Sequence, residues 1–189
     1  MGVDITGKNP IIRSPKPQYP NWNDTDEEEK EMFFKHLDKW ESENPGDYFR
    51  SNWWGWRPIV MLVEFANDDY ELGFDLSNWG SNDGAGLDNQ EDCNRLADVL
   101  EEMIQNETEL EDDIDTIYLN LGSWTNMSGR FLGGEIEEKL NEQYPIGNVL
   151  YQSVVMEDGS IVHPAHSAPL RHLNNFIAFL RECGGFEIW

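Results

Sequence analysis

An aromatic and arginine cluster in the first third of the chain has the residue types best suited to binding chemistry. Eleven consecutive residues, 48–58, contain five aromatic rings and two arginines. An aromatic ring can stack on a planar ligand, and a guanidinium can bind an anion or lie over a ring. The alternative is a structural cluster, with its rings in the core and its arginines paired to nearby carboxylates. The candidate ligand-binding residues are Tyr48, Arg50, Trp53, Trp54, Trp56 and Arg57.

Three tryptophans within four residues cannot all enter one core, because successive side chains point in different directions. At least one of Trp53, Trp54 and Trp56 should therefore reach the surface or a groove. Pro58 has no amide hydrogen to lose and suits the first turn of a helix. The sequence predicts a helix over residues 57–65.

Three histidines within ten residues could in principle hold a zinc ion. The candidate ligands are His163, His166 and His172, with Cys93 or a carboxylate as a fourth. However, Pro164 and Pro169 predict an irregular loop, and the spacing matches no metalloenzyme motif. Structural or incidental histidines are favoured, and we expect neither a metal nor a cofactor.

Other catalytic signatures are missing from the sequence. No motif sets a nucleophile beside a base, so a non-enzymatic role is favoured. Cys93 and Cys183 are too few and too far apart along the chain to indicate a disulfide framework or a zinc ribbon.

Negative charge dominates the composition, with 37 acidic and 13 basic residues and a net charge of −24. Between Pro58 and Gly129 the only basic residue is Arg95. Such a field repels nucleic acid and anionic membranes and attracts basic proteins, so we expect a basic protein partner. The alternative is a solvated face that keeps the protein in solution. The candidate partner-binding residues, whose carboxylates could imitate phosphates, are Glu91, Asp98, Glu101, Glu102, Asp112 and Asp113.

The chain is long enough for a single domain, residues 1–189, with its own core. Four prolines predict an extended arm over residues 9–22. Strands are predicted at both ends of the chain, and a hairpin is predicted over residues 149–162 around the Asp158–Gly159 turn. We expect an α+β fold in which a small mixed or antiparallel sheet packs against three or four helices.

Helix signals separate these strands. Asp24 or Thr25 begins a helix with an apolar stripe of Phe33, Leu37 and Trp40. Further helices are predicted over residues 88–105, 135–144 and 171–181, and Gly184–Gly185 ends the last of them.

Four blocks of the chain carry a family resemblance. They are the opening Met1-Gly2-Val3-Asp4 with Gly7 and Pro10, residues 48–58, Asn82-Asp83-Gly84 before a helix, and residues 176–186 with Gly184–Gly185. Together they resemble a family of small uncharacterised proteins of phages and their bacterial hosts. The resemblance covers those blocks alone and implies a phage or prokaryotic cytosol, without any activity or catalytic residue. The chain departs from the family pattern by placing Gly55 within the tryptophan run.

Two functions are open at this point. The first is a non-enzymatic acidic phage protein that binds and inhibits a host factor, such as a defence or nucleic-acid-handling protein, for instance by nucleic-acid mimicry. The alternative is a protein that binds or sequesters a small anionic or aromatic, nucleotide-like ligand, or an enzyme, using residues 48–58. With no apolar run long enough to cross a bilayer and no secretory signal, we expect the cytoplasm, that of the host cell for a phage protein.

Overall fold

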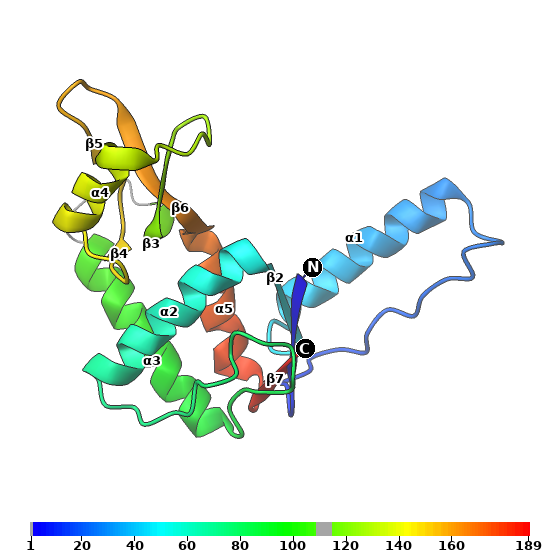
Figure 1. Cartoon of the computed structure of the whole chain (residues 1–189). Helices are drawn as coiled ribbons and strands as arrows, with labels where there is room; N and C mark the ends of the chain where they lie inside the picture. The colour runs from blue at the N-terminus through cyan, green and yellow to red at the C-terminus, as the bar shows by residue number, and fades with distance from the viewer. Residues whose placement is uncertain (1, 109–114) are drawn as a thin grey trace.

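The computed structural model describes residues 2–108 and 115–189. Over these residues it contains five helices and two antiparallel sheets (Figure 1), which confirms the predicted α+β class. The helices are α1 (Glu27–Glu43), α2 (Trp53–Asp69), α3 (Gln90–Thr108), α4 (Gly134–Gln143) and α5 (Leu170–Glu182). The strands are β1 (Gly2–Gly7), β2 (Tyr48–Asn52), β3 (Thr116–Asn126), β4 (Val149–Leu150), β5 (Val154–Val155), β6 (Ile161–Pro169) and β7 (Phe186–Ile188).

The first sheet joins the two ends of the chain. Its order is β2-β1-β7, and Ile5 of β1 lies opposite Ile188 of β7. The predicted terminal strands are therefore both present and both in this sheet. Val3 and Ile5 of the central strand are completely buried, because this face of the sheet covers the main core.

Only the part of the predicted hairpin next to its turn forms, and it belongs to a second sheet of order β4-β3-β6-β5, in which Val149 and Leu150 (β4) pair with β3 instead. Val154 pairs with Val162 across a turn in which Gly159 has φ of 79°, the conformation expected for the Asp-Gly turn. The expectation of a single sheet was wrong, because β6 continues for nine residues and pairs chiefly with β3 instead of with the terminal strands.

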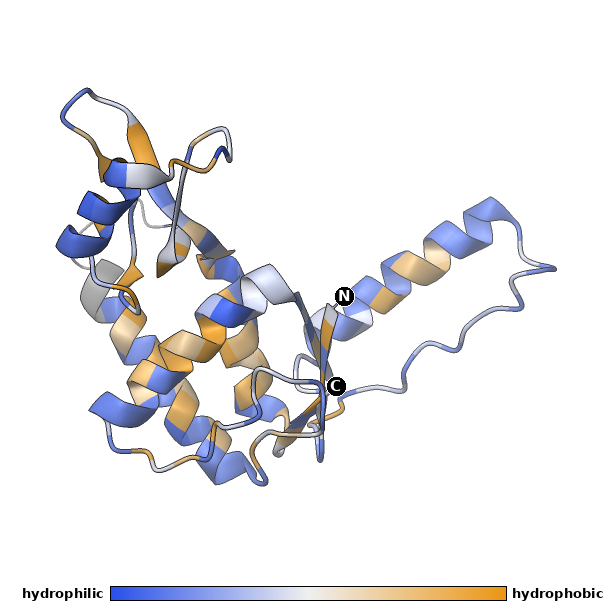
Figure 2. Ribbon diagram, in the orientation of Figure 1, coloured by the Kyte–Doolittle hydropathy of each residue, from blue (hydrophilic) through white to orange (hydrophobic). Residues whose placement is uncertain are grey.

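Helices α2, α3 and α5 pack together with the first sheet around the main core (Figure 1), and Figure 2 shows apolar stretches in orange on all three helices. The apolar periodicity of α5 places Leu173, Phe176 and Leu180 in this core. A second, smaller core of Trp124, Leu140 and Val162 lies between the second sheet and α4.

Helix α2 begins at Trp53, four residues earlier than predicted. The Asn52 side chain accepts a hydrogen bond from the backbone N–H of Gly55 at 2.8 Å and so caps the helix. Pro58 is therefore buried inside α2, where it removes one hydrogen bond of the helix. The Asn52 cap, not Pro58, fixes where the aromatic cluster becomes helical.

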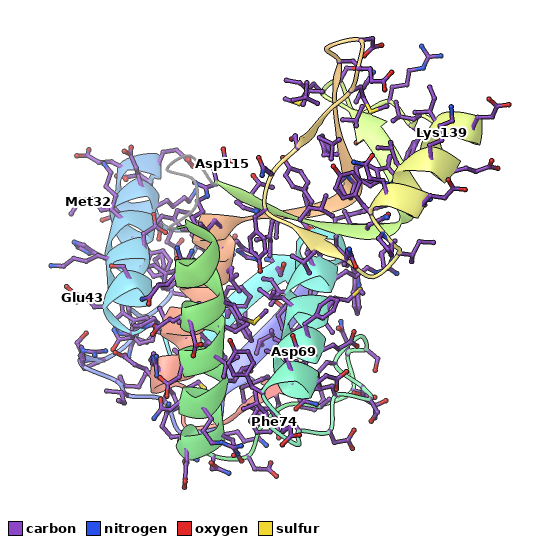
Figure 3. The ribbon with its side chains drawn as sticks, turned by 90° about the vertical axis from the view of Figure 1, so that its left-hand side faces the viewer. Met32, Glu43, Asp69, Phe74, Asp115 and Lys139 are labelled. Carbon is purple, nitrogen blue, oxygen red and sulfur yellow. The ribbon has the colours of Figure 1, made fainter. Side chains whose placement is uncertain are left out.

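The predicted arm contains neither helix nor strand, and together with α1 it projects from the body of the molecule (Figure 1). Asp26 caps α1, one or two residues later than predicted, by accepting a hydrogen bond from the Glu29 N–H at 2.8 Å. Figure 3 shows α1, marked by Met32 and Glu43, along the outside of the molecule. None of the described helices is both long enough and apolar enough to cross a bilayer.

Candidate functional site

The first turns of α2 separate the three clustered tryptophans into different environments. Trp56 is completely buried and donates its indole N–H to the Trp79 carbonyl at 2.9 Å. Trp53 is half-buried against the main core, whereas Trp54 is 60% exposed. Side chains one residue apart on a helix point in directions about 100° apart, so only some of the rings can face the core. The expectation that at least one ring reaches the surface is confirmed.

Trp54 is held in place by a histidine from the second sheet. Its indole stacks on the His166 ring with centroids 5.0 Å apart and planes 19° apart. Burial, with a smaller contribution from nearby Arg57, lowers the pKa of His166, which favours the neutral imidazole. The exposed part of the indole therefore stands as a platform for another planar group.

An open cavity of about 630 Å³ lies beside this platform, where α2 and α5 begin. Arg50 comes from β2, and Arg171 from the first turn of α5. No carboxylate is among the described residues that line the cavity, although the chain has 37 acidic residues. The lining residues are Gly2, Arg50, Ser51, Asn52, Trp54, Gly55, Ser167, Pro169, Arg171 and His172.

Two helix N-termini add to the positive character of this cavity. Asn52 and Gly55 of the α2 N-terminus line it, as do Pro169 and Arg171 at the start of α5. The Gly55 N–H is taken by the Asn52 side chain and the Leu170 N–H by the Asp115 carbonyl, each at 2.8 Å, but the helix dipole still places partial positive charge at both helix starts. An anionic group is thus the chemistry that this cavity favours.

One wall of the cavity holds a serine and histidine pair that the sequence did not reveal. His172 Nε2 lies 2.9 Å from Ser51 Oγ, although the two residues are 121 positions apart. The Ser51 hydroxyl also lies 3.0 Å from the Asn52 carbonyl, and in the tautomer in which it donates there, His172 Nε2 carries the proton and donates to Ser51. In this arrangement Nε2 is not available as a base for Ser51. Burial first, and Arg171 second, lower the pKa of His172 and keep the ring neutral.

The remaining predicted ligand-binding residues lie outside this cavity. Arg57 lines a smaller cavity of about 370 Å³ with Trp53, Trp54 and Gly80. Tyr48 donates its hydroxyl to Asp4, and burial followed by this bond raises the pKa of Tyr48 to about 12. The predicted cluster is thus divided: Arg50 and Trp54 meet at the larger cavity, and Trp54 is shared with the smaller one.

The three candidate metal ligands do not converge. The predicted loop is in fact strand β6, and His163 and His166, three residues apart on it, lie on opposite faces of the sheet. His163 contacts Tyr118, whereas His172 lies on α5 and is hydrogen-bonded to Ser51 of β2. Within residues 2–108 and 115–189, no three His, Cys, Asp or Glu side chains are grouped in a way that could hold a metal ion.

The predicted acidic ridge lies on α3, but part of it is used internally. Arg181 of α5 binds both Asp98 and Glu101, each at 2.6 Å. Glu102 accepts a hydrogen bond from the Tyr70 hydroxyl at 3.3 Å, and Glu91 is exposed. Asp112 and Asp113 lie outside the described residues. The ridge therefore presents less uncompensated charge than the sequence suggests.

The two cysteines, 90 residues apart, meet in the main core. Their sulfur atoms are 3.5 Å apart, because α3 packs against the end of α5. Both thiols are free and buried. The hydrogen bond from Cys183, together with burial, raises the pKa of Cys93, so this thiol stays protonated.

Comparisons of the chain with protein-family models, curated proteins and solved structures find no match. The resemblance to phage proteins therefore stays a prediction. Any function must be argued from the geometry of the cavity and the charge of the surface.

Proposed function

We propose that this protein binds a small anionic ligand carrying a planar ring, such as a nucleotide, in the cavity where α2 and α5 begin. One observation carries the proposal: Arg50, Arg171 and two helix N-termini surround a cavity whose described lining residues include no carboxylate, in a chain with a net charge of −24. Arg50 pairs at 3.6 Å with Asp4, which is not among the lining residues, so Arg171 supplies the less compensated charge. Because the rest of the protein is so acidic, this local concentration of positive groups favours an anion in this cavity.

The shape of the site suggests how such a ligand would lie. A phosphate or carboxylate would bind between Arg50 and Arg171, since a guanidinium offers paired N–H donors to these groups. A planar ring would stack on the exposed part of Trp54. A volume of about 630 Å³ is within the usual range for small-molecule sites. We place this activity in the cytoplasm, and sequestration of the ligand requires no catalysis.

The test is a thermal-shift titration with a panel of nucleotides, supported by native mass spectrometry. We expect at least one nucleotide to raise the melting temperature of the protein. Arg171→Ala and Trp54→Ala should each weaken its binding by about tenfold, the effect of losing one charge-assisted hydrogen bond or one ring contact.

Arg57→Ala is the matched control, because it removes an exposed arginine of α2, the helix of Trp54, that lines only the smaller cavity. It should leave nucleotide affinity unchanged. The proposal fails if no member of the panel binds. It also fails if Arg57→Ala weakens binding while Arg171→Ala does not, because the smaller cavity would then be the site.

A second candidate function is inhibition of a basic host protein, such as a defence or nucleic-acid-handling factor, through the acidic surface. The observation in its favour is that Glu91 and Glu102 are exposed on α3 in a strongly acidic chain. Complementary charge steers basic proteins toward such a surface. Phage origin remains part of this proposal.

Charge reversal on α3 tests this second function. In affinity capture from a bacterial lysate, the wild-type protein should recover a basic protein that Glu91→Lys/Glu102→Lys recovers about tenfold less well. Asp98 and Glu101 are left unchanged because they hold Arg181. Equal recovery by both proteins would argue against an α3 interface.

A further inference from the structure

The arm and α1 form a projecting unit, residues 8–43, that we call the finger (Figure 1). Its base is fixed to the body. Arg13 binds the Glu182 carboxylate through both terminal nitrogens, at 2.5 and 2.6 Å, and its backbone N–H bonds Asn44. The Trp40 indole donates to the Ser14 carbonyl at 2.7 Å and so joins the arm to α1. The finger is therefore held in a defined position.

The outer part of the finger carries a small aromatic cluster that remains partly open. Phe33 is buried beneath Tyr19, Trp22 and Phe34, with ring centroids 5.0 to 6.0 Å apart. Trp22 and Phe34 also contact each other at 5.6 Å, yet they are 40% and 48% exposed. Two adjacent exposed rings on a projecting element are unusual for a surface that faces only water.

Carboxylates continue this aromatic surface along one face of α1. Glu27, Glu31, Phe34, Asp38 and Glu41 recur at helical spacing and are all exposed. Glu27 and Glu31 pair with lysines of the same helix, which are weak contacts at a surface. Asp38 and Glu41 form no ion pair among the described residues. Helix α1 carries seven carboxylates and three lysines, a net charge of −4.

We propose that this face of the finger is a docking site for an arginine-rich segment of a partner protein. A guanidinium can stack on the rings of Trp22 and Phe34 and can also bind the flanking carboxylates of Asp38 and Glu41 through paired N–H groups. Lysine fits less well because its compact ammonium stacks and pairs less effectively. A second copy of the chain is disfavoured, because it would bring like charges together on an already acidic surface.

This inference rests on the second candidate function, the binding of a basic partner, and adds the finger to α3 as a contact surface. It is independent of the cavity and its ligand. Failure of nucleotide binding would therefore leave it untouched.

The experiment measures binding of a fluorescent oligo-arginine peptide to the full chain by fluorescence anisotropy at physiological ionic strength. Asp38→Lys/Glu41→Lys should weaken binding by about tenfold or more. Trp22→Ala/Phe34→Ala, which leaves the charge unchanged, should weaken it several-fold. An oligo-lysine peptide of equal length should bind the wild-type protein less tightly than oligo-arginine does. The variants should not distinguish the two peptides. Circular dichroism confirms that each variant is folded.

Glu91→Lys/Glu102→Lys is the matched control, because it changes the net charge by the same amount on α3. It should weaken peptide binding by less than the finger charge variant does. If the α3 variant has the larger effect, the finger inference is overturned while binding of a basic partner survives. If both charge variants have equal effects and the aromatic variant has none, the peptide responds only to total charge and the finger is not a site. Sedimentation showing a dimer that Phe34→Ala dissociates would assign the surface to a second copy instead.

Discussion

Replacing Trp56 by alanine is expected to lower the free energy of unfolding by about 3–5 kcal/mol, the cost of deleting a large buried ring. The Trp56 side chain is completely buried and contacts the rings of Phe49, Trp79 and Phe176. The substitution also leaves the Trp79 carbonyl without its indole donor. Urea denaturation followed by circular dichroism measures the difference.

Trp54→Ala is the control for this prediction, since it removes the same side chain two residues earlier in the same helix. Trp54 is 60% exposed, and a substitution at such a position changes stability by about 0.5 kcal/mol or slightly more. Its effect should fall on ligand binding instead. Equal loss of stability in the two variants would contradict the assignment of one tryptophan to the core and the other to the cavity.

Gly184→Ala is expected to destabilise the protein by at least about 2 kcal/mol, because two costs combine. Gly184 has φ of 67°, a conformation that side chains disfavour. A Cβ atom there would also lie 2.3 Å from the Asn9 carbonyl oxygen, so the backbone would have to move. This junction joins the arm to α5, with the Asn9 N–H bonded to the Cys183 carbonyl at 3.1 Å. Thermal and urea denaturation both report the loss.

Gly73→Ala separates these two costs. Gly73 has a similar φ of 76°, but a Cβ atom there would meet nothing within 4 Å. Its substitution should cost only the conformational strain, about 1–2 kcal/mol. If the two glycine variants lose the same stability, the close approach to Asn9 is not a constraint in the folded protein.

Local patterns predicted the elements well. The apolar periodicity of residues 171–181 predicts α5, and Gly184–Gly185 ends it as expected. The Asp158–Gly159 turn predicts the β5 and β6 pairing. These signals work because helix spacing, positive φ and turn chemistry depend on neighbouring residues. Asn52 and Pro58 are both signals for the start of a helix. The prediction followed Pro58, so it placed the start of α2 about one turn too late.

The cavity could be predicted only in part. Residues 48–58 supply Arg50 and Trp54, and the concentration of rings and arginines indicated them. Arg171 and His172 were missed as neighbours of this cluster, because they lie more than a hundred positions away and are brought there by the packing of α5. The acidic ridge was overestimated for the same reason, since Arg181 neutralises Asp98 and Glu101 across two helices.

By itself, the sequence determined the charge of this protein, its α+β class and which stretches carry rings, carboxylates and turns, since each depends on composition or on residues a few positions apart. The tertiary structure alone decided which tryptophan is buried, which arginines share a cavity and which carboxylates remain unpaired. Those outcomes depend on contacts between distant segments, and no periodicity within one segment records them.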